Sequence, residues 1–130
     1  YEAFDWHSPE AARRSVYRVV WRGIADPFME ALDFPDLGLL APKRSFSVSS
    51  LQALTLFNND FVLHHSERLA ERLEREGAAG GERVRRAFRL VYQREPTREE
   101  SLGFGSYSER HGLPAMCRVL FNSNEFLFVD

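Results

Sequence analysis

The chain has 130 residues, a length that suits one domain able to bury roughly two-thirds of its unfolded surface. A hydrophobic content of 44% and a charged content of 28% exclude wholesale disorder, and a net charge of −2 argues against a nucleic-acid-binding protein. No apolar run reaches the roughly 20 residues that cross a bilayer, and the single cysteine, Cys117, excludes an internal disulfide. Because the chain starts at Tyr1 without an initiator Met or signal peptide, we expect residues 1–130 to be one domain of a larger multidomain protein.

The N-terminal residues predict a short helix followed by an element that fits either a strand or a helix. Ser-Pro-Glu at 8–10 supplies an N-cap, a proline for the first helical position and an acid for the first turn. Residues 14–21 are rich in β-branched and aromatic side chains, which favours a strand. The valines in this segment also fit helical spacing, so strand and helix both stay open.

Residues 23–48 are expected to form a long ordered loop. Repeated glycines and prolines interrupt this segment too often for a long helix or strand. Its many apolar side chains make it unsuitable as a free linker, so we expect it to pack onto the helices that follow.

Three amphipathic helices are predicted after the loop. The first begins at Ser49 or Ser50 and ends at Phe57, and the others cover 60–76 and 82–93. We expect the second and third to pack together at the centre of the core. The residues predicted to be buried are Leu51, Leu54 and Phe57 in the first helix, Phe61, Val62, His65, Leu69 and Leu73 in the second, and Val84, Ala87, Phe88 and Val91 in the third.

The C-terminal part predicts two further helices. Thr97 followed by Glu100 forms a capping-box pattern for one helix, and Gly112 suits its C-terminal end. Pro114 opens the last helix, which we expect to run to Asn122. The predicted fold is therefore mainly α: a small orthogonal helical bundle with a long ordered loop and a minor extended segment near the N-terminus.

Several short motifs occur in the order found in one known family. They are Asp-Phe-Pro-Asp at 33–36, Leu-Gln-Ala-Leu at 51–54, Arg-Glu-Pro-Thr-Arg-Glu-Glu at 94–100 and Asn-Ser-Asn-Glu-Phe at 122–126. On these motifs the chain resembles the planctomycete-specific domain one family over nearly its whole length. The resemblance implies the C-terminal domain of a large exported protein that often also carries a cytochrome c-like domain. It therefore implies an extracytoplasmic location, in the periplasm or at the cell surface, and it supplies no established catalytic residue.

The ligand spacing predicts no cofactor and no metal in this chain. Covalent c-type haem needs Cys-x-x-Cys-His, whereas Cys117 is followed by Arg-Val-Leu, so any haem belongs to another part of the parent protein. His64 and His65 are adjacent rather than four residues apart, and a pair of this spacing does not share a helix face for zinc.

Asp33 and Asp36 are the strongest candidates for a polar site. Two carboxylates in a loop suit acid–base or metal chemistry, but Asp in such loops more often bonds to nearby backbone N–H groups. We therefore favour a polar network that pins the loop, and the same residues would line a ligand site if they faced a cleft. The further members expected are Arg13, Arg14, Arg44, Gln52 and Asn58.

Two classes of function follow. The leading interpretation is a non-catalytic structural or interaction domain at the C-terminus of an exported, cytochrome-c-associated multidomain protein. Its expected partners are the upstream domains of the same protein, with a separate protein or polysaccharide as a further candidate. The alternative is part of an enzyme that acts on polysaccharide or in redox chemistry together with upstream domains. Nucleic acid is not expected, because the arginine run of 83–98 is interleaved with Glu82, Glu95, Glu99 and Glu100, which gives a face of mixed charge.

Overall fold

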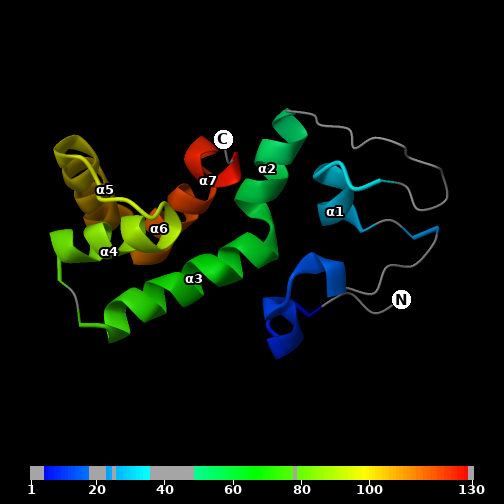
Figure 1. Cartoon of the computed structure of the whole chain (residues 1–130), viewed down its shortest axis with the longest axis horizontal. Coiled ribbons are helices and arrows are strands. Elements are labelled where there is room, and N and C mark those ends of the chain that lie inside the picture. The colour runs from blue at the N-terminus through cyan, green and yellow to red at the C-terminus, as the bar shows by residue number, and fades with distance from the viewer. Residues whose placement is uncertain (1–4, 18–22, 25, 36–48, 78, 129–130) are drawn as a thin grey trace. The chain divides into compact units, whose positions relative to one another are not determined.

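The protein is mainly α, as the helical periodicity predicts, and the residues that the structure describes contain no strand. The computed structural model describes residues 5–17, 23–24, 26–35, 49–77 and 79–128 (Figure 1). The chain divides into an N-terminal unit, Tyr1–Asn59, and a C-terminal unit, Asp60–Asp130. The expectation of one domain over 1–130 stays a prediction, since two such units can belong to one domain.

The N-terminal unit begins with two turns of 3-10 helix. The first, Pro9–Ala12, is short as predicted, but Ser8 does not cap it through its side chain. Instead the Ser8 hydroxyl donates to the carbonyl oxygen of Asp5 at 2.9 Å. The second turn is Ser15–Tyr17, so the first residues of the candidate strand are not extended. Residues 18–22 lie outside the described residues, and the extended segment stays a prediction there.

The expected loop over 23–48 contains a short helix, α1 (Pro27–Ala31). Asp26 caps it, because its carboxylate accepts from the backbone N–H groups of Phe28 and Met29 at 3.0 Å each. The prediction of an irregular segment was therefore wrong for 27–31. The Asp-Pro pair at 26–27 is an N-cap followed by a first-turn proline, and it was the local signal for this helix. Residues 36–48 lie outside the described residues.

Helix α2 (Ser50–Asn58) starts where expected but exposes the face predicted to be buried. Ser49 and Gln52 form a reciprocal capping box. Leu51 is 63% exposed, Leu54 60% and Phe57 42%, so the predicted buried face was wrong. The half-buried side of α2 includes Gln52, and α1 packs against this helix. Leu56 also lies on this half-buried side, and a hydrogen bond joins Gln52 to Asp33, just beyond α1.

The C-terminal unit contains the remaining helices. They are α3 (Asp60–Arg75), α4 (Gly81–Val91), α5 (Arg98–His111), α6 (Leu113–Phe121) and α7 (Asn124–Leu127). Helix α6 contacts α3, α4, α5 and α7, and so lies at the centre of the unit (Figure 1). The capping box of Thr97 and Glu100 starts α5 as predicted, and Gly112, with φ of 89°, ends α5 and precedes α6.

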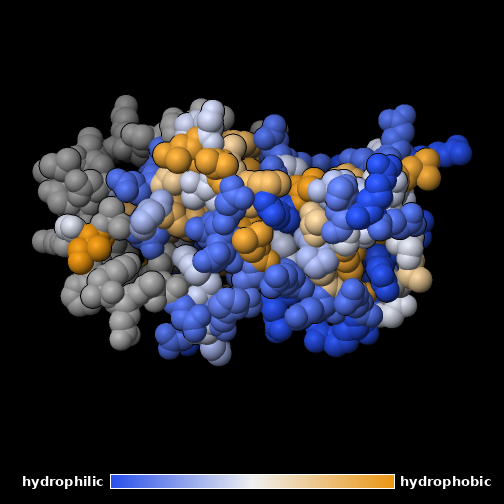
Figure 2. All heavy atoms as spheres, turned by 180° about the vertical axis from the view of Figure 1, so that it is seen from behind, coloured by the Kyte–Doolittle hydropathy of each residue, from blue (hydrophilic) through white to orange (hydrophobic). Residues whose placement is uncertain are grey.

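The core joins α3, α4 and α6, which confirms the predicted packing of the helix carrying Leu73 against the helix carrying Phe88. Both side chains are fully buried, and Tyr92 and Phe104 stand edge-on to the Phe88 ring. The buried members of the core are Ala70, Leu73, Val84, Ala87, Phe88, Leu113, Met116, Cys117 and Leu120. Around them, hydrophilic atoms cover much of the C-terminal unit on the face shown in Figure 2, between separate hydrophobic areas.

The buried face of α3 differs slightly from the predicted one. Phe61, His65 and Leu69 are half-buried, whereas Ser66 and Ala70 are buried. Ser66 can be buried because its hydroxyl donates to the Val62 carbonyl oxygen at 2.6 Å, one turn earlier in the same helix. A helical periodicity that counts only apolar residues cannot identify Ser66 as a buried position.

Candidate functional site: a polar cluster centred on Arg94

Arg94 lies three residues after the end of α4, and an unusual backbone turn precedes it. Tyr92 is the C-cap of α4, and Gln93 has φ of 58°, in the left-handed region that residues other than glycine rarely adopt. This turn carries the chain away from the helix axis. The Arg94 guanidinium carbon then lies 5.2 Å from the centre of the Phe88 ring and 5.5 Å from that of Tyr92. Arg94 therefore covers the edge of the aromatic core with a cation.

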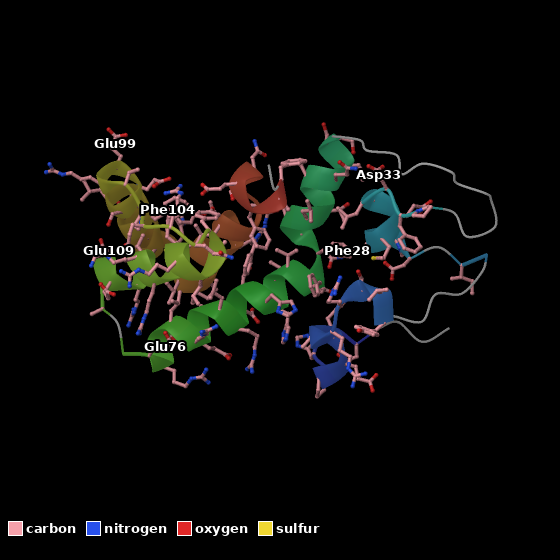
Figure 3. The ribbon with its side chains drawn as sticks, viewed as in Figure 1. Phe28, Asp33, Glu76, Glu99, Phe104 and Glu109 are labelled. Carbon is pink, nitrogen blue, oxygen red and sulfur yellow. The ribbon has the colours of Figure 1, made fainter. Side chains whose placement is uncertain are left out.

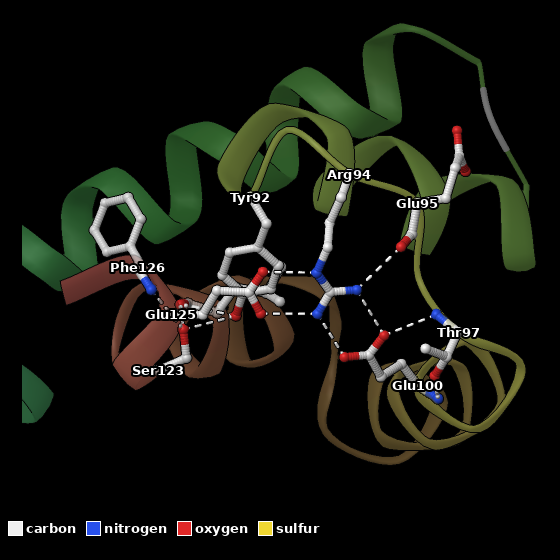
Figure 4. Close-up of polar contacts among 9 residues, drawn as sticks. Tyr92, Arg94, Glu95, Thr97, Glu100, Ser123, Glu125 and Phe126 are labelled. Carbon is white, nitrogen blue, oxygen red and sulfur yellow. Dashed lines mark hydrogen bonds and ion pairs between the residues drawn. The ribbon is translucent and has the colours of Figure 1, made fainter. Parts of the chain in front are cut away.

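Every N–H group of the Arg94 guanidinium has an acceptor (Figure 4). Glu100 accepts from Nη1 at 2.9 Å and from Nη2 at 2.7 Å. Glu125 accepts from Nε at 2.6 Å and from Nη2 at 2.7 Å, and the Glu95 carbonyl oxygen accepts from Nη1 at 3.0 Å. Since a guanidinium has five such donors, this set is complete, and two paired carboxylates give it a fixed orientation.

The partners of Arg94 also hold the ends of two helices. Glu100 accepts from the backbone N–H of Thr97 at 2.7 Å, which is half of the capping box of α5. Ser123 caps α7, and the Tyr92 hydroxyl donates to the Ser123 hydroxyl oxygen at 2.8 Å. The cluster therefore links the end of α4, the start of α5 and the start of α7.

The charges of the cluster stabilise one another in their ionised forms. Hydrogen bonds from Arg94 lower the pKa of Glu100 to about 2, and they also lower the pKa of Glu125. The two carboxylates raise the pKa of Arg94. A general acid or base works best with a pKa near the working pH, and these groups are shifted away from it. The arrangement is suited to holding helices together rather than to proton transfer.

The structure brings two of the sequence-predicted site residues together. Gln52 Nε2 donates to a carboxylate oxygen of Asp33 at 3.1 Å. Asp33 itself has φ of 59° and follows α1, and its N–H donates to the Glu30 carbonyl oxygen. Figure 3 shows Asp33 at this end of the helix, with Phe28 near its start. The Asp33 backbone and side chain thus end α1 and join it to α2 within the N-terminal unit.

Of the other residues predicted for the polar network, the structure describes Asn58, Arg13 and Arg14. Asn58 donates to the Leu54 carbonyl oxygen at 3.2 Å within its own helix, while Arg13 and Arg14 are exposed. Asp36 and Arg44 lie outside the described residues. The full polar network over 23–48 therefore stays a prediction.

Sequence reasoning missed Arg94 and Glu125 as partners. Their separation of 31 residues leaves no local spacing signal. The one available clue was the Thr97–Glu100 capping box next to Arg94, which indicates an ordered carboxylate close to a cation.

Two titratable groups in or near the core, His65 and Cys117, have pKa values that burial shifts toward their neutral forms. Burial lowers the pKa of His65, with smaller contributions from the neighbouring charges of His64 and Arg68. Burial raises the pKa of the Cys117 thiol to about 12. In the part of the chain that the structure describes, no three His, Cys, Asp or Glu side chains are arranged to hold a metal ion. The absence of a cofactor stays a prediction.

The fold is a small helical bundle in which the hydrogen-bonded Arg94 cluster joins three helix ends. A family model, PSD1, a protein of unknown function (DUF1553), matches residues 3–107, and the chain belongs to this family. No curated protein and no solved structure matches the chain. Within the described residues, no helix has the length and apolar character needed to cross a membrane.

Proposed function

We propose that the chain is a non-catalytic structural and interaction domain in an exported multidomain protein, with the upstream domains of that protein as its partners. The observation that carries the proposal is the Arg94 cluster. Its cation donates all five N–H groups within the domain, and its two carboxylates join the starts of α5 and α7 to the end of α4. The charged groups whose pKa values are shifted most, Arg94 and Glu100, therefore contribute to the arrangement of the helices.

The context comes from the family. Membership in PSD1 supports a domain of unknown function. The proposal of an exported parent with a cytochrome c-like domain rests on the resemblance of the sequence motifs alone. Under this proposal the domain lies outside the cytoplasm, and haem is bound by a different part of the parent. A pyridine haemochrome assay on the intact parent and on this domain should give haem in the parent only, and cell fractionation should place the parent in the periplasm or at the surface.

A mutational test on the intact parent separates the structural role from a catalytic one. Arg94→Gln should lower the melting temperature of the domain, while any turnover of the parent should change only in proportion to the folded fraction. The double variant Asp33→Ala, Asp36→Ala tests the alternative of an enzyme part acting on polysaccharide or in redox chemistry. Lost turnover at an unchanged melting temperature would favour that alternative, and lost stability would favour the structural role.

A further inference from the structure

A second arginine-rich feature lies beside the Arg94 cluster but does not belong to it. It is an open pocket of about 450 Å³ between α4 and the start of α5. Arg85 and Arg89 line it from α4, and Arg98 lines it from the first turn of α5. We call these three side chains and the space between them the arginine pocket.

The positive charge of the arginine pocket is only partly balanced. Arg85 and Arg89 both pair with one carboxylate, that of Glu95, and the Arg85 Nε lies 3.4 Å from it. Arg85 also contacts Glu82 at 3.1 Å. Of the carboxylates in the described part of the chain, none forms an ion pair with Arg98. The lining of the pocket thus contains three arginines and a single carboxylate, that of Glu95.

The arginine side chains, rather than the helix terminus, provide the binding groups. The capping box of α5 already engages the backbone N–H groups of Thr97 and Glu100. The pocket also has an apolar side, because Leu102 lines it and is 67% exposed. Glu99 is exposed and projects outward from the first turn of α5 (Figure 3), and it is not part of the lining.

We propose that the arginine pocket binds a phosphate ester, with Glu95 occupying the position of the phosphate oxygens in the free protein. Two guanidinium groups that converge on one carboxylate have the geometry that arginine uses for oxyanions. A phosphate monoester carries close to two charges near neutral pH and matches the unbalanced pocket better than a single carboxylate does. Leu102 would contact the organic part of the ester.

The role of Glu95 leads to a specific expectation. Since Glu95 pairs with both arginines and is half-exposed, a ligand phosphate has to displace it from them. Removal of its charge should therefore increase affinity rather than reduce it. A pocket whose ion pairs were merely structural would bind phosphate neither before nor after this change.

The test is a titration of the full chain with phenyl phosphate and, separately, inorganic phosphate at constant ionic strength, followed by NMR signals of the arginine Nε–H groups. Phenyl phosphate should bind saturably, and Glu95→Gln should tighten binding by about fivefold or more. Arg89→Gln and Arg98→Gln should each weaken it by about tenfold. Arg68→Gln, which removes an exposed arginine of α3, is the matched control and should leave binding unchanged.

The two ligands distinguish an ester site from a site for the free ion. Tighter binding of phenyl phosphate than of inorganic phosphate, lost in Leu102→Ser, supports the ester. Equal binding of the two ligands overturns the ester assignment. Absence of saturable binding, or no gain in Glu95→Gln while its circular dichroism stays native, overturns the site itself. Neither result affects the structural role proposed for the Arg94 cluster.

Discussion

At the scale of single residues, Phe88 is the largest fully buried side chain among the described residues. Its side chain is fully buried, and the ring centres of Tyr92 and Phe104 lie 5.0 and 5.2 Å away, both edge-on. Phe88→Ala should therefore lower the free energy of unfolding by about 3–5 kcal/mol, measured by urea denaturation. Phe88→Leu, which fills part of the space, should cost less. A near-neutral Phe88→Ala would contradict this position for the ring.

Gln93 illustrates a cost in backbone conformation. Its φ of 58° is in the left-handed region, where a side chain with a Cβ is disfavoured by roughly 1–2 kcal/mol. Gln93→Gly should relieve this cost, although the more flexible unfolded chain offsets part of the gain. We expect a net stabilisation of about 0.5 kcal/mol by thermal denaturation.

Gln93→Ala is the control for that substitution, because alanine keeps the Cβ and should bring no comparable gain. If Gln93→Gly were less stable than Gln93→Ala, the left-handed backbone would not be the factor that limits stability at this turn.

At the scale of elements, Arg94 connects three helix ends through one planar group. Arg94→Gln should lower the free energy of unfolding by about 1–2 kcal/mol, allowing for screening of a side chain that is 36% exposed. Arg94→Lys should lose most of this stability as well, because an ammonium group cannot pair with two carboxylates through a planar fork. Arg68→Gln, which breaks an exposed pair on α3, should change stability by less than about 0.5 kcal/mol. A fully tolerated Arg94→Lys would show that charge alone is sufficient.

The same cluster predicts an acid-dependent loss of stability. The Glu100 pKa is about 2 in the folded protein against a usual value of 4.5, so the unfolded chain takes up a proton first as the pH falls. The stabilisation from Glu100 is therefore complete above about pH 4.5 and is lost as the pH falls toward about 2. Urea denaturation across this range should show a weaker pH dependence in Glu100→Gln, since glutamine retains the capping position without titrating. An unchanged pH dependence in this variant would exclude Glu100 as a contributor.

The elements also show which features local sequence can predict. The capping boxes at 49–52 and 97–100 depend on residues three apart; the second was predicted, and for the first the start of the helix at Ser49 or Ser50 was predicted. The apolar stripe of α4 was also predicted from local sequence, with Val84, Ala87 and Phe88 buried and Val91 half-buried. The half-buried side of α2 was not predictable in this way, because α1 and the Gln52–Asp33 bond, between residues 19 apart, lie against it. The Arg94–Glu125 pair could not be predicted from local sequence either, because its residues are 31 apart.

At the scale of the whole molecule, buried apolar side chains are distributed unevenly between the two units. The core cluster lies entirely within Asp60–Asp130. Among the described residues of Tyr1–Asn59, Ala11 alone is buried. Since burial of apolar surface is the main favourable term in folding, the described elements of the two units should differ in local stability.

Amide hydrogen exchange on the full chain should resolve this difference. Amides of α3, α4 and α6 should exchange only through global unfolding, whereas those of α1 and α2 should exchange through smaller openings and lose their protection at lower denaturant. A fragment of residues 60–130 should keep the protection of α3, α4 and α6, because all members of the core cluster lie within it. Phe88→Ala should reduce that protection throughout the fragment, while Leu54→Ala in the full chain, at a 60% exposed position, should leave it unchanged. Equal protection of α2 and α6, or a fragment that fails to fold, would show that the N-terminal unit supplies stability to the core.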